Sequence, residues 1–218
     1  MSCSSLYGIK KDFTGEEIAE YRNSWWFTPI VRGVLPEKYV PSLVFTPYGF
    51  KNSIIGLQGN EIWKATNDCV NKCNSTADRV CWELSNQQIF FSKDKVCIAN
   101  AIRQFLADNK SYDKSDEDGI CILEREHIIE RFQEIANDIE NLDETEYEYF
   151  VFKNTSCDDN VEYWFFKRDE ETGEYVSRPI SEIKDEFIAE FVVIVNDSIK
   201  EFIDNRKFFN KLNKDLER

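Results

Sequence analysis

Histidine is almost absent from this chain of 218 residues, and glycine is scarce. The one histidine is His127, so a hydrolase triad built on serine or cysteine would have to include that residue. The eight glycines leave little material for loops that cradle phosphate. No G-x-S-x-G, P-loop, HExxH or dinucleotide-binding glycine pattern occurs. These absences argue against the enzyme classes that such motifs define.

Long apolar runs are also missing. The longest run, 187–195, is short and is interrupted by Glu190, so no segment has the apolar length needed to span a bilayer. Residues 1–11 lack the basic leader and apolar run of a secretion signal. The seven cysteines are odd in number and lie mostly within periodic apolar patterns, which favours buried free thiols in a reducing compartment. We therefore expect a cytoplasmic protein with no membrane partner.

Acidic residues are abundant and unevenly distributed. Residues 1–112 carry 13 Lys/Arg against 11 Asp/Glu, and residues 191–218 carry 6 against 5. Residues 113–190 carry 8 against 25, a local net charge of −17 within a total of −14. This field favours a basic protein surface or a cationic ligand, and it repels nucleic acid. Because aromatic residues make up 14% of the chain, the acidity does not indicate disorder.

Hydrophobic periodicity predicts an α+β fold that is mainly helical, with a small antiparallel sheet and a long C-terminal helix. The predicted helices cover 14–22, 60–73, 76–84, 93–108, 123–142 and, as the long C-terminal helix, 181–205. The predicted strands cover 88–91 and, in a C-terminal meander, 147–152, 161–166 and 174–176. Prolines predict short extended pieces over 24–31 and 40–47.

The length suits a single domain over 1–218. A two-lobe division would fall in the polar loop 110–120, where the charge changes. Residues 1–110 would then form a lobe rich in proline, aromatic residues and helix. Residues 120–218 would hold the acidic helix, the hairpin and the long C-terminal helix.

The helix predicted over 123–142 has one apolar side and one acidic side. Only Arg125 and Arg131 offset its carboxylates, whereas ordinary surface helices mix charges to gain i,i+4 pairs. A merely solvated helix is the alternative, since glutamate is a good helix former. The imbalance favours a partner-binding face, made of Glu124, Glu126, Glu130, Glu134, Asp138 and Glu140.

A run of three aromatic residues, Trp25, Trp26 and Phe27, gives a second candidate surface. Clustered aromatics usually belong to a core. Three consecutive side chains cannot all point the same way, however, so at least one should lie near the surface. Because aromatic anchors dominate protein interfaces, Trp25 and Trp26 are predicted to bind the partner.

Two clusters could hold a metal ion. Cys69, Cys73 and Cys81 could combine with His127, but their spacing differs from that of zinc knuckles, and packing on helix faces explains them. Asp158 and Asp159 could bind a divalent cation with other carboxylates, although an ordinary hairpin turn explains the same residues. We predict no catalytic residue, no metal site and no cofactor.

The leading hypothesis is a non-catalytic, acidic binding protein that inhibits or neutralises a protein partner, of the toxin-immunity or phage anti-defence kind. Its partner would present a basic surface, such as that of a nuclease or another nucleic-acid-binding protein, without direct contact to nucleic acid. The alternative is a metal-dependent enzyme that acts on a phosphate-containing small molecule through clustered Asp and Glu. A third hypothesis is a scaffold that self-associates through the long C-terminal helix; the sequence leaves the oligomeric state open.

Overall fold

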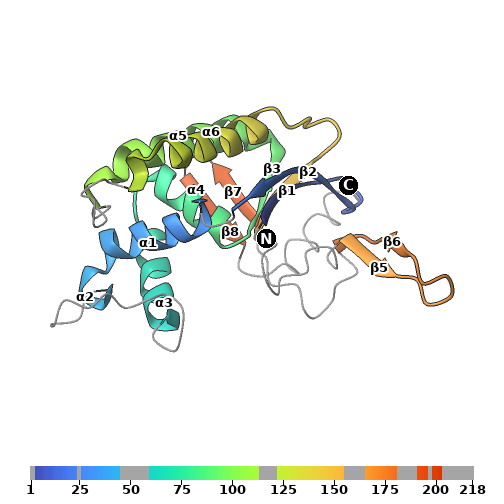
Figure 1. The fold of residues 1–218 in the computed structure, drawn as a ribbon, viewed down its shortest axis with the longest axis horizontal. Coiled ribbons are helices and arrows are strands. Elements are labelled where there is room, and N and C mark those ends of the chain that lie inside the picture. The colour runs from blue at the N-terminus through green and yellow to red at the C-terminus, as the bar shows by residue number, and fades with distance from the viewer. Residues whose placement is uncertain are drawn as a thin grey trace. The chain divides into compact units, whose positions relative to one another are not determined.

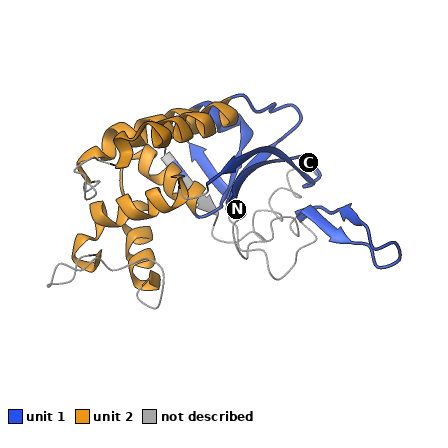
Figure 2. Ribbon diagram, viewed as in Figure 1, with its two compact units in different colours: residues 1–24, 86–96, 141–218 blue, residues 25–85, 97–140 orange. Residues whose placement is uncertain are grey.

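The computed structural model describes residues 3–23, 26–44, 59–112, 122–154, 165–180, 191–195 and 198–202 (Figure 1). The chain forms two compact units, shown in separate colours in Figure 2. We call residues 1–24, 86–96 and 141–218 the sheet unit, and residues 25–85 and 97–140 the helical unit. Most of the loop 110–120, where a two-lobe division would fall, lies outside the described residues. The single domain over 1–218 stays a prediction.

The sheet unit contains a mixed six-stranded sheet. Its strands run in the order β2-β1-β4-β3-β7-β8, and every neighbouring pair is antiparallel except β3 and β7, which are parallel. A separate hairpin is made by two further strands, β5 and β6. The strands are β1 (Cys3–Ile9), β2 (Gly15–Arg22), β3 (Ile89–Phe91), β4 (Tyr149–Asn154), β5 (Phe166–Arg168), β6 (Tyr175–Ser177), β7 (Phe191–Val195) and β8 (Ser198–Phe202).

The predicted fold class is wrong. The sheet is mixed and six-stranded rather than small and antiparallel, and the C-terminal elements differ from the prediction in two respects. The predicted C-terminal helix over 181–205 contains strands β7 and β8, and its remaining residues lie outside the described part. The predicted meander is also wrong, because β4 pairs with β1 and β3 in the large sheet while β5 pairs with β6. The β-branched run Val192–Val195 explains the first error, since such residues favour strands. The self-association hypothesis depended on this helix and is withdrawn.

The predicted helix over 14–22 is likewise wrong, because these residues form strand β2, apart from Thr14. Thr14 does not cap a helix: its hydroxyl donates to Asp12 Oδ1 at 2.6 Å, and its backbone N–H donates to the same oxygen at 3.0 Å. These two bonds lower the pKa of Asp12. They also stabilise the turn that joins β1 to β2, in which Phe13 adopts a positive φ of 67°.

Among the described residues, six α-helices build the helical unit, and the fifth of them begins in the sheet unit. They are α1 (Thr28–Tyr39), α2 (Pro41–Val44), α3 (Gly59–Val70), α4 (Thr76–Ser85), α5 (Lys95–Asn109) and α6 (Glu126–Glu140). The periodicity predictions for α3, α4, α5 and α6 are confirmed to within a few residues. The extended pieces predicted over 24–31 and 40–47 are wrong, since α1 and α2 occupy much of both. Pro29 lies in the first turn of α1, where a proline costs no hydrogen bond.

Each unit has its own aromatic core. In the helical unit, the Phe132 ring of α6 lies 4.7 Å from that of Phe27 and 5.9 Å from that of Phe105, centroid to centroid. In the sheet unit, Tyr149 and Phe191 meet edge to face at 5.5 Å. Such contacts between buried rings contribute to the packing of each core.

The β5–β6 hairpin is fixed to the large sheet within the sheet unit. Phe165, fully buried, stacks on Tyr7 of β1 with ring centroids 5.2 Å apart. The Arg178 N–H donates to the Phe165 carbonyl at 2.7 Å, and the Ile180 N–H donates to the Phe13 carbonyl at 3.0 Å. The hairpin therefore has a defined place next to β1 and β2.

Candidate functional site

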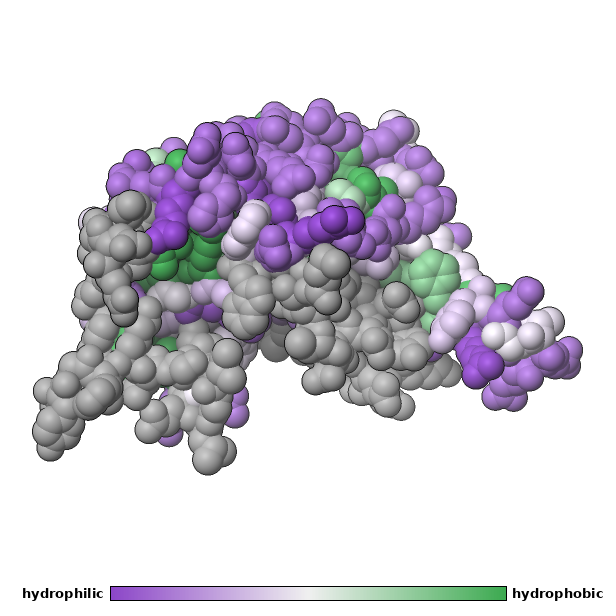
Figure 3. Space-filling model, in the orientation of Figure 1, coloured by the Kyte–Doolittle hydropathy of each residue, from purple (hydrophilic) through white to green (hydrophobic). Residues whose placement is uncertain are grey.

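Helix α6 is amphipathic, as predicted. Five side chains, recurring every three or four residues, form its buried side: Ile128, Phe132, Ile135, Ala136 and Ile139. The opposite side is exposed and consists of Glu126, Glu130, Gln133, Glu134 and Asn137. Figure 3 shows a hydrophilic surface over this helix. The acidic side chains of α6 therefore face solvent rather than the core of the helical unit.

Cations pair with three of the six predicted acidic residues. Lys110 Nζ lies 3.2 Å from Glu124, Arg131 Nε lies 3.0 Å from Glu134, and an Arg103 nitrogen lies 2.5 Å from Glu140. Asp138 is half-buried. The carboxylate of each pair is exposed, so each pair contributes little to stability, but the pairs reduce the net charge of the face.

The acidic face is thus centred on Glu126 and Glu130. Both are exposed, and no ion pair to either is found among the described residues. Glu134 extends the row by one turn, because residues four apart lie on the same side of a helix. The negative charge of Glu126 and Glu130 is consequently less compensated than that of Glu134, which pairs with Arg131.

Trp26 lies beside this row of carboxylates. Its ring centroid is 4.8 Å from that of His127, and the Arg131 guanidinium lies over it at 5.3 Å. Both partners are on α6, flanking Glu130 in the sequence. The structure therefore brings together two surfaces that the sequence predicts separately. We call Trp26, Glu126, Glu130 and Glu134 the acid–Trp face. The other predicted anchor, Trp25, lies outside the described residues.

The rest of the acidic segment is split. The loop 113–121 lies outside the described residues, and the acidic stretch after residue 140 belongs to the sheet unit. The acid–Trp face depends on the helical unit alone.

No described residues form a group of three or more His, Cys, Asp or Glu side chains that could hold a metal ion. Five cysteines in this part of the chain are free thiols: Cys3, Cys69, Cys73, Cys81 and Cys97. His127 is half-buried against Trp26 rather than near these thiols. Asp158 and Asp159, on which the metal-dependent alternative relies, lie outside the described residues.

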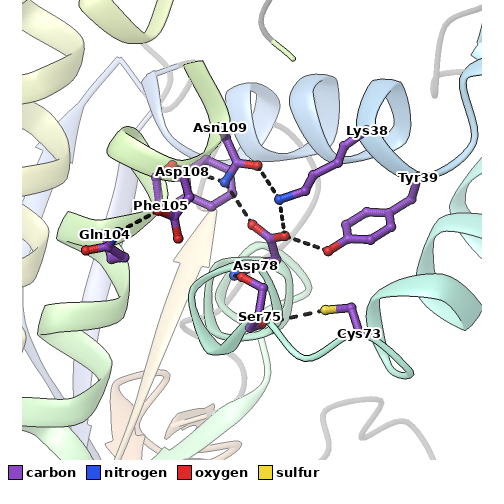
Figure 4. Close-up of polar contacts among 9 residues, drawn as sticks. All are labelled: Lys38, Tyr39, Cys73, Ser75, Asp78, Gln104, Phe105, Asp108 and Asn109. Atoms are coloured by element: carbon purple, nitrogen blue, oxygen red, sulfur yellow. Dashed lines mark hydrogen bonds and ion pairs between the residues drawn. The ribbon is translucent and has the colours of Figure 1, made fainter. Parts of the chain in front are cut away.

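A polar network that sequence reasoning missed lies inside the helical unit (Figure 4). Asp78 of α4 is fully buried and accepts three hydrogen bonds from α1 and α5. Lys38 Nζ and the Tyr39 hydroxyl each donate to its Oδ2 at 2.6 Å, and Asn109 Nδ2 donates to its Oδ1 at 2.8 Å. Lys38 also donates to Asn109 Oδ1 at 2.9 Å. The network links α1, α4 and α5.

This network is suited to holding helices together. The Asp78 carboxylate is shielded from solvent, and both of its oxygens accept hydrogen bonds from protein donors. Burial is the main reason that the pKa of Tyr39 is raised, and the hydrogen bond to Asp78 adds to it. The Asp78 carboxylate has no exposed surface to offer a substrate, and its partners Lys38 and Tyr39 are each occupied by it. We therefore assign the network to stability.

Three tyrosines should make the free energy of unfolding depend on pH in the alkaline range. Burial, followed by the hydrogen bond to Glu16, raises the pKa of Tyr147 to about 12, and burial also raises the pKa of Tyr39 and Tyr149. An unfolded chain releases these phenolic protons near pH 10, whereas the native chain retains them. The free energy of unfolding should therefore be fully retained below about pH 10 and fall as pH rises toward 12. Urea unfolding at a series of alkaline pH values measures this.

Matched variants test the cause. Tyr147→Phe should weaken the alkaline loss of stability, whereas Tyr175→Phe should leave it unchanged because Tyr175 is 58% exposed. If tyrosinate absorbance showed all nine tyrosines ionising together near pH 10 in the folded protein, the interpretation would be wrong.

The comparisons with known proteins give no family. No protein-family model matches the chain, and no curated protein or solved structure is similar to it. Among the described helices, none is both long enough and apolar enough to cross a membrane. The function must therefore be argued from the residues themselves.

Proposed function

We propose that this chain is a non-catalytic cytoplasmic binding protein that inhibits or neutralises a basic protein partner, of the toxin-immunity or phage anti-defence kind. The acid–Trp face carries the proposal, because it combines exposed carboxylates with an aromatic side chain on one helix surface. The partner would present lysines and arginines, as the nucleic-acid-binding surface of a nuclease does.

The two components of this face would act at different steps of binding. Glu126 and Glu130 would attract the basic surface from a distance and so increase the association rate. Trp26, held by His127 and Arg131, would bury apolar area once the complex forms and so slow dissociation. Because Trp26 already packs on α6, little conformational freedom would be lost on binding.

Charge reversal tests the role of the carboxylates. The variant Glu126→Lys/Glu130→Lys should associate with its partner at least about tenfold more slowly at low salt. The matched control, Glu61→Lys/Asp68→Lys, changes the net charge equally but alters exposed residues of α3. Quantitative pull-downs from the native cell with wild type and both variants would identify basic proteins retained by wild type and control but lost with the α6 variant. The association rate of the purified pair is then measured.

Salt dependence and Trp26→Ala complete the test. The association rate of wild type should fall as salt rises, since ions screen the field, and the α6 variant should depend on salt much less. Trp26→Ala should weaken affinity by about tenfold, mainly through faster dissociation. Identical captured proteins for wild type and the α6 variant, or an association rate independent of salt, would refute the proposed function.

A further inference from the structure

A pocket in the sheet unit has aromatic walls and a carboxylate. Tyr7 of β1, Glu17 of β2, Phe166 of β5 and Tyr175 of β6 line it, and its volume is about 330 Å³. This volume lies at the lower end of the range for small-molecule sites. The four described lining residues all belong to the sheet unit, and none of them belongs to the acid–Trp face.

Strand register explains why these four side chains meet. Tyr7 and Glu17 are direct partners in the β1–β2 ladder, so their side chains lie on the same face of the sheet. In the hairpin, Phe166 pairs with Ser177 and Arg168 pairs with Tyr175, which places the rings of Phe166 and Tyr175 diagonally on one face. The stacking of Phe165 on Tyr7 brings this hairpin next to β1.

The carboxylate of Glu17 is held at the pocket. The Tyr7 hydroxyl donates to Glu17 Oε2 at 3.1 Å. No cation pairs with Glu17 among the described residues, whereas its neighbour Glu16 pairs with Lys10 at 2.6 Å. One carboxylate therefore contributes uncompensated negative charge beside aromatic rings, whose faces are also negative.

We infer that this pocket binds a quaternary ammonium group. Aromatic faces and a nearby carboxylate attract a cation and repel anions. A metal ion would require several oxygen ligands, and the described lining supplies a single carboxylate. A primary ammonium is strongly hydrated and needs acceptors for its three N–H groups. A quaternary ammonium has no N–H group, so rings can replace its hydration shell.

Arg168 limits the affinity. It lies directly opposite Tyr175 in the hairpin, and its Nε donates to the Gly173 carbonyl at 3.2 Å. This guanidinium brings positive charge to the same face as the pocket. With Tyr175 58% exposed, the site is also open to water, and cation–π attraction is weaker there. We expect tetramethylammonium to bind in roughly the millimolar range.

Ligand-observed NMR on the full chain tests the assignment. The methyl protons of tetramethylammonium should shift upfield in a saturable manner, because they lie over the rings. Choline should bind at least about tenfold more tightly than 3,3-dimethylbutan-1-ol, which has the same shape without the charge. A peptide with trimethyllysine distinguishes the source: tighter binding than choline indicates a protein side chain, and equal or weaker binding indicates a small molecule. Equal affinity for choline and the neutral analogue would overturn the inference.

Variants at exposed positions locate the site. Tyr175→Leu and Glu17→Gln should each weaken choline binding by about tenfold, while Tyr175→Phe keeps the ring and should bind like wild type. Val176→Ala is the matched control, because Val176 lies on the opposite face of β6. Unfolding curves identical to wild type would establish that the variants fold. Binding that survives both Tyr175→Leu and Glu17→Gln would place the ligand elsewhere and exclude this pocket.

Discussion

Replacing Asp78 by alanine should lower the free energy of unfolding by about 3–5 kcal/mol, because it removes one partner of a buried ion pair. Asp78 is fully buried, and the Lys38 side chain is only 16% exposed. Without the carboxylate, the ammonium keeps Asn109 as an acceptor but loses its counter-charge. The Tyr39 hydroxyl also loses the acceptor of its 2.6 Å hydrogen bond. Urea unfolding of the full chain measures the change.

Two further variants distinguish a charge effect from a general loss of packing. Tyr39→Phe removes one hydrogen bond and should cost about 1 kcal/mol. Asp108→Ala, at an exposed aspartate of α5 that accepts from Gln104, should change stability by no more than about 0.5 kcal/mol. A cost below about 1 kcal/mol for Asp78→Ala would contradict the interpretation, since it would mean that water or another acceptor compensates Lys38.

The helices of the second quarter of the chain and α6 could be predicted because their apolar residues repeat with the helical period. The apolar repeat in α6 is sustained from Ile128 to Ile139, and it provides the buried side of the helix. Local periodicity was sufficient here because each of these helices presents an apolar side to a core. The same argument explains why the exposure of Glu126 and Glu130 could be predicted.

The sheet could not be predicted because its pairings are distant in sequence. Strand β1 pairs with β4 some 145 residues later in the chain, with Leu6 opposite Phe152, and β3 pairs with β7. A hydrophobic pattern indicates which residues are buried but not which strand lies beside them. The apolar spacing in β2 led to a wrong prediction of a helix. Ile18 and Tyr21 are spaced as on one face of a helix, but of the two only Tyr21 is buried.

Only part of the candidate site could be predicted, because some of its contacts also join residues that are distant in sequence. The acidic side predicted over 123–142 follows from local spacing, but the cations that pair with Glu124 and Glu140 are Lys110 and Arg103, which lie outside that segment. The Lys38–Asp78 pair joins residues 40 positions apart, and nothing in the local pattern connects them. Tertiary contacts, rather than composition, therefore determine how much of the acidic charge remains uncompensated.

Replacing Gly15 by alanine should destabilise the chain by about 1–3 kcal/mol, the usual cost of overpacking. A Cβ atom at Gly15 would meet the ring of Phe165, approaching its Cγ to 2.7 Å. That ring is fully buried and stacks on Tyr7, so it cannot move aside without disturbing the hairpin that carries Phe166 and Tyr175. Urea unfolding measures the cost, and faster trypsin cleavage in the hairpin would report its displacement.

Gly33→Ala is the matched control, with the opposite expected sign. Gly33 lies within α1, and an added Cβ would meet no atom within 4 Å, so alanine should stabilise the helix by about 0.5–1 kcal/mol. A double-mutant cycle with Phe165→Leu identifies the clash: if the ring causes it, Gly15→Ala should cost less in the Phe165→Leu background than in wild type. Additive effects would mean that alanine at position 15 destabilises the chain without meeting the Phe165 ring, and the proposed clash would be wrong.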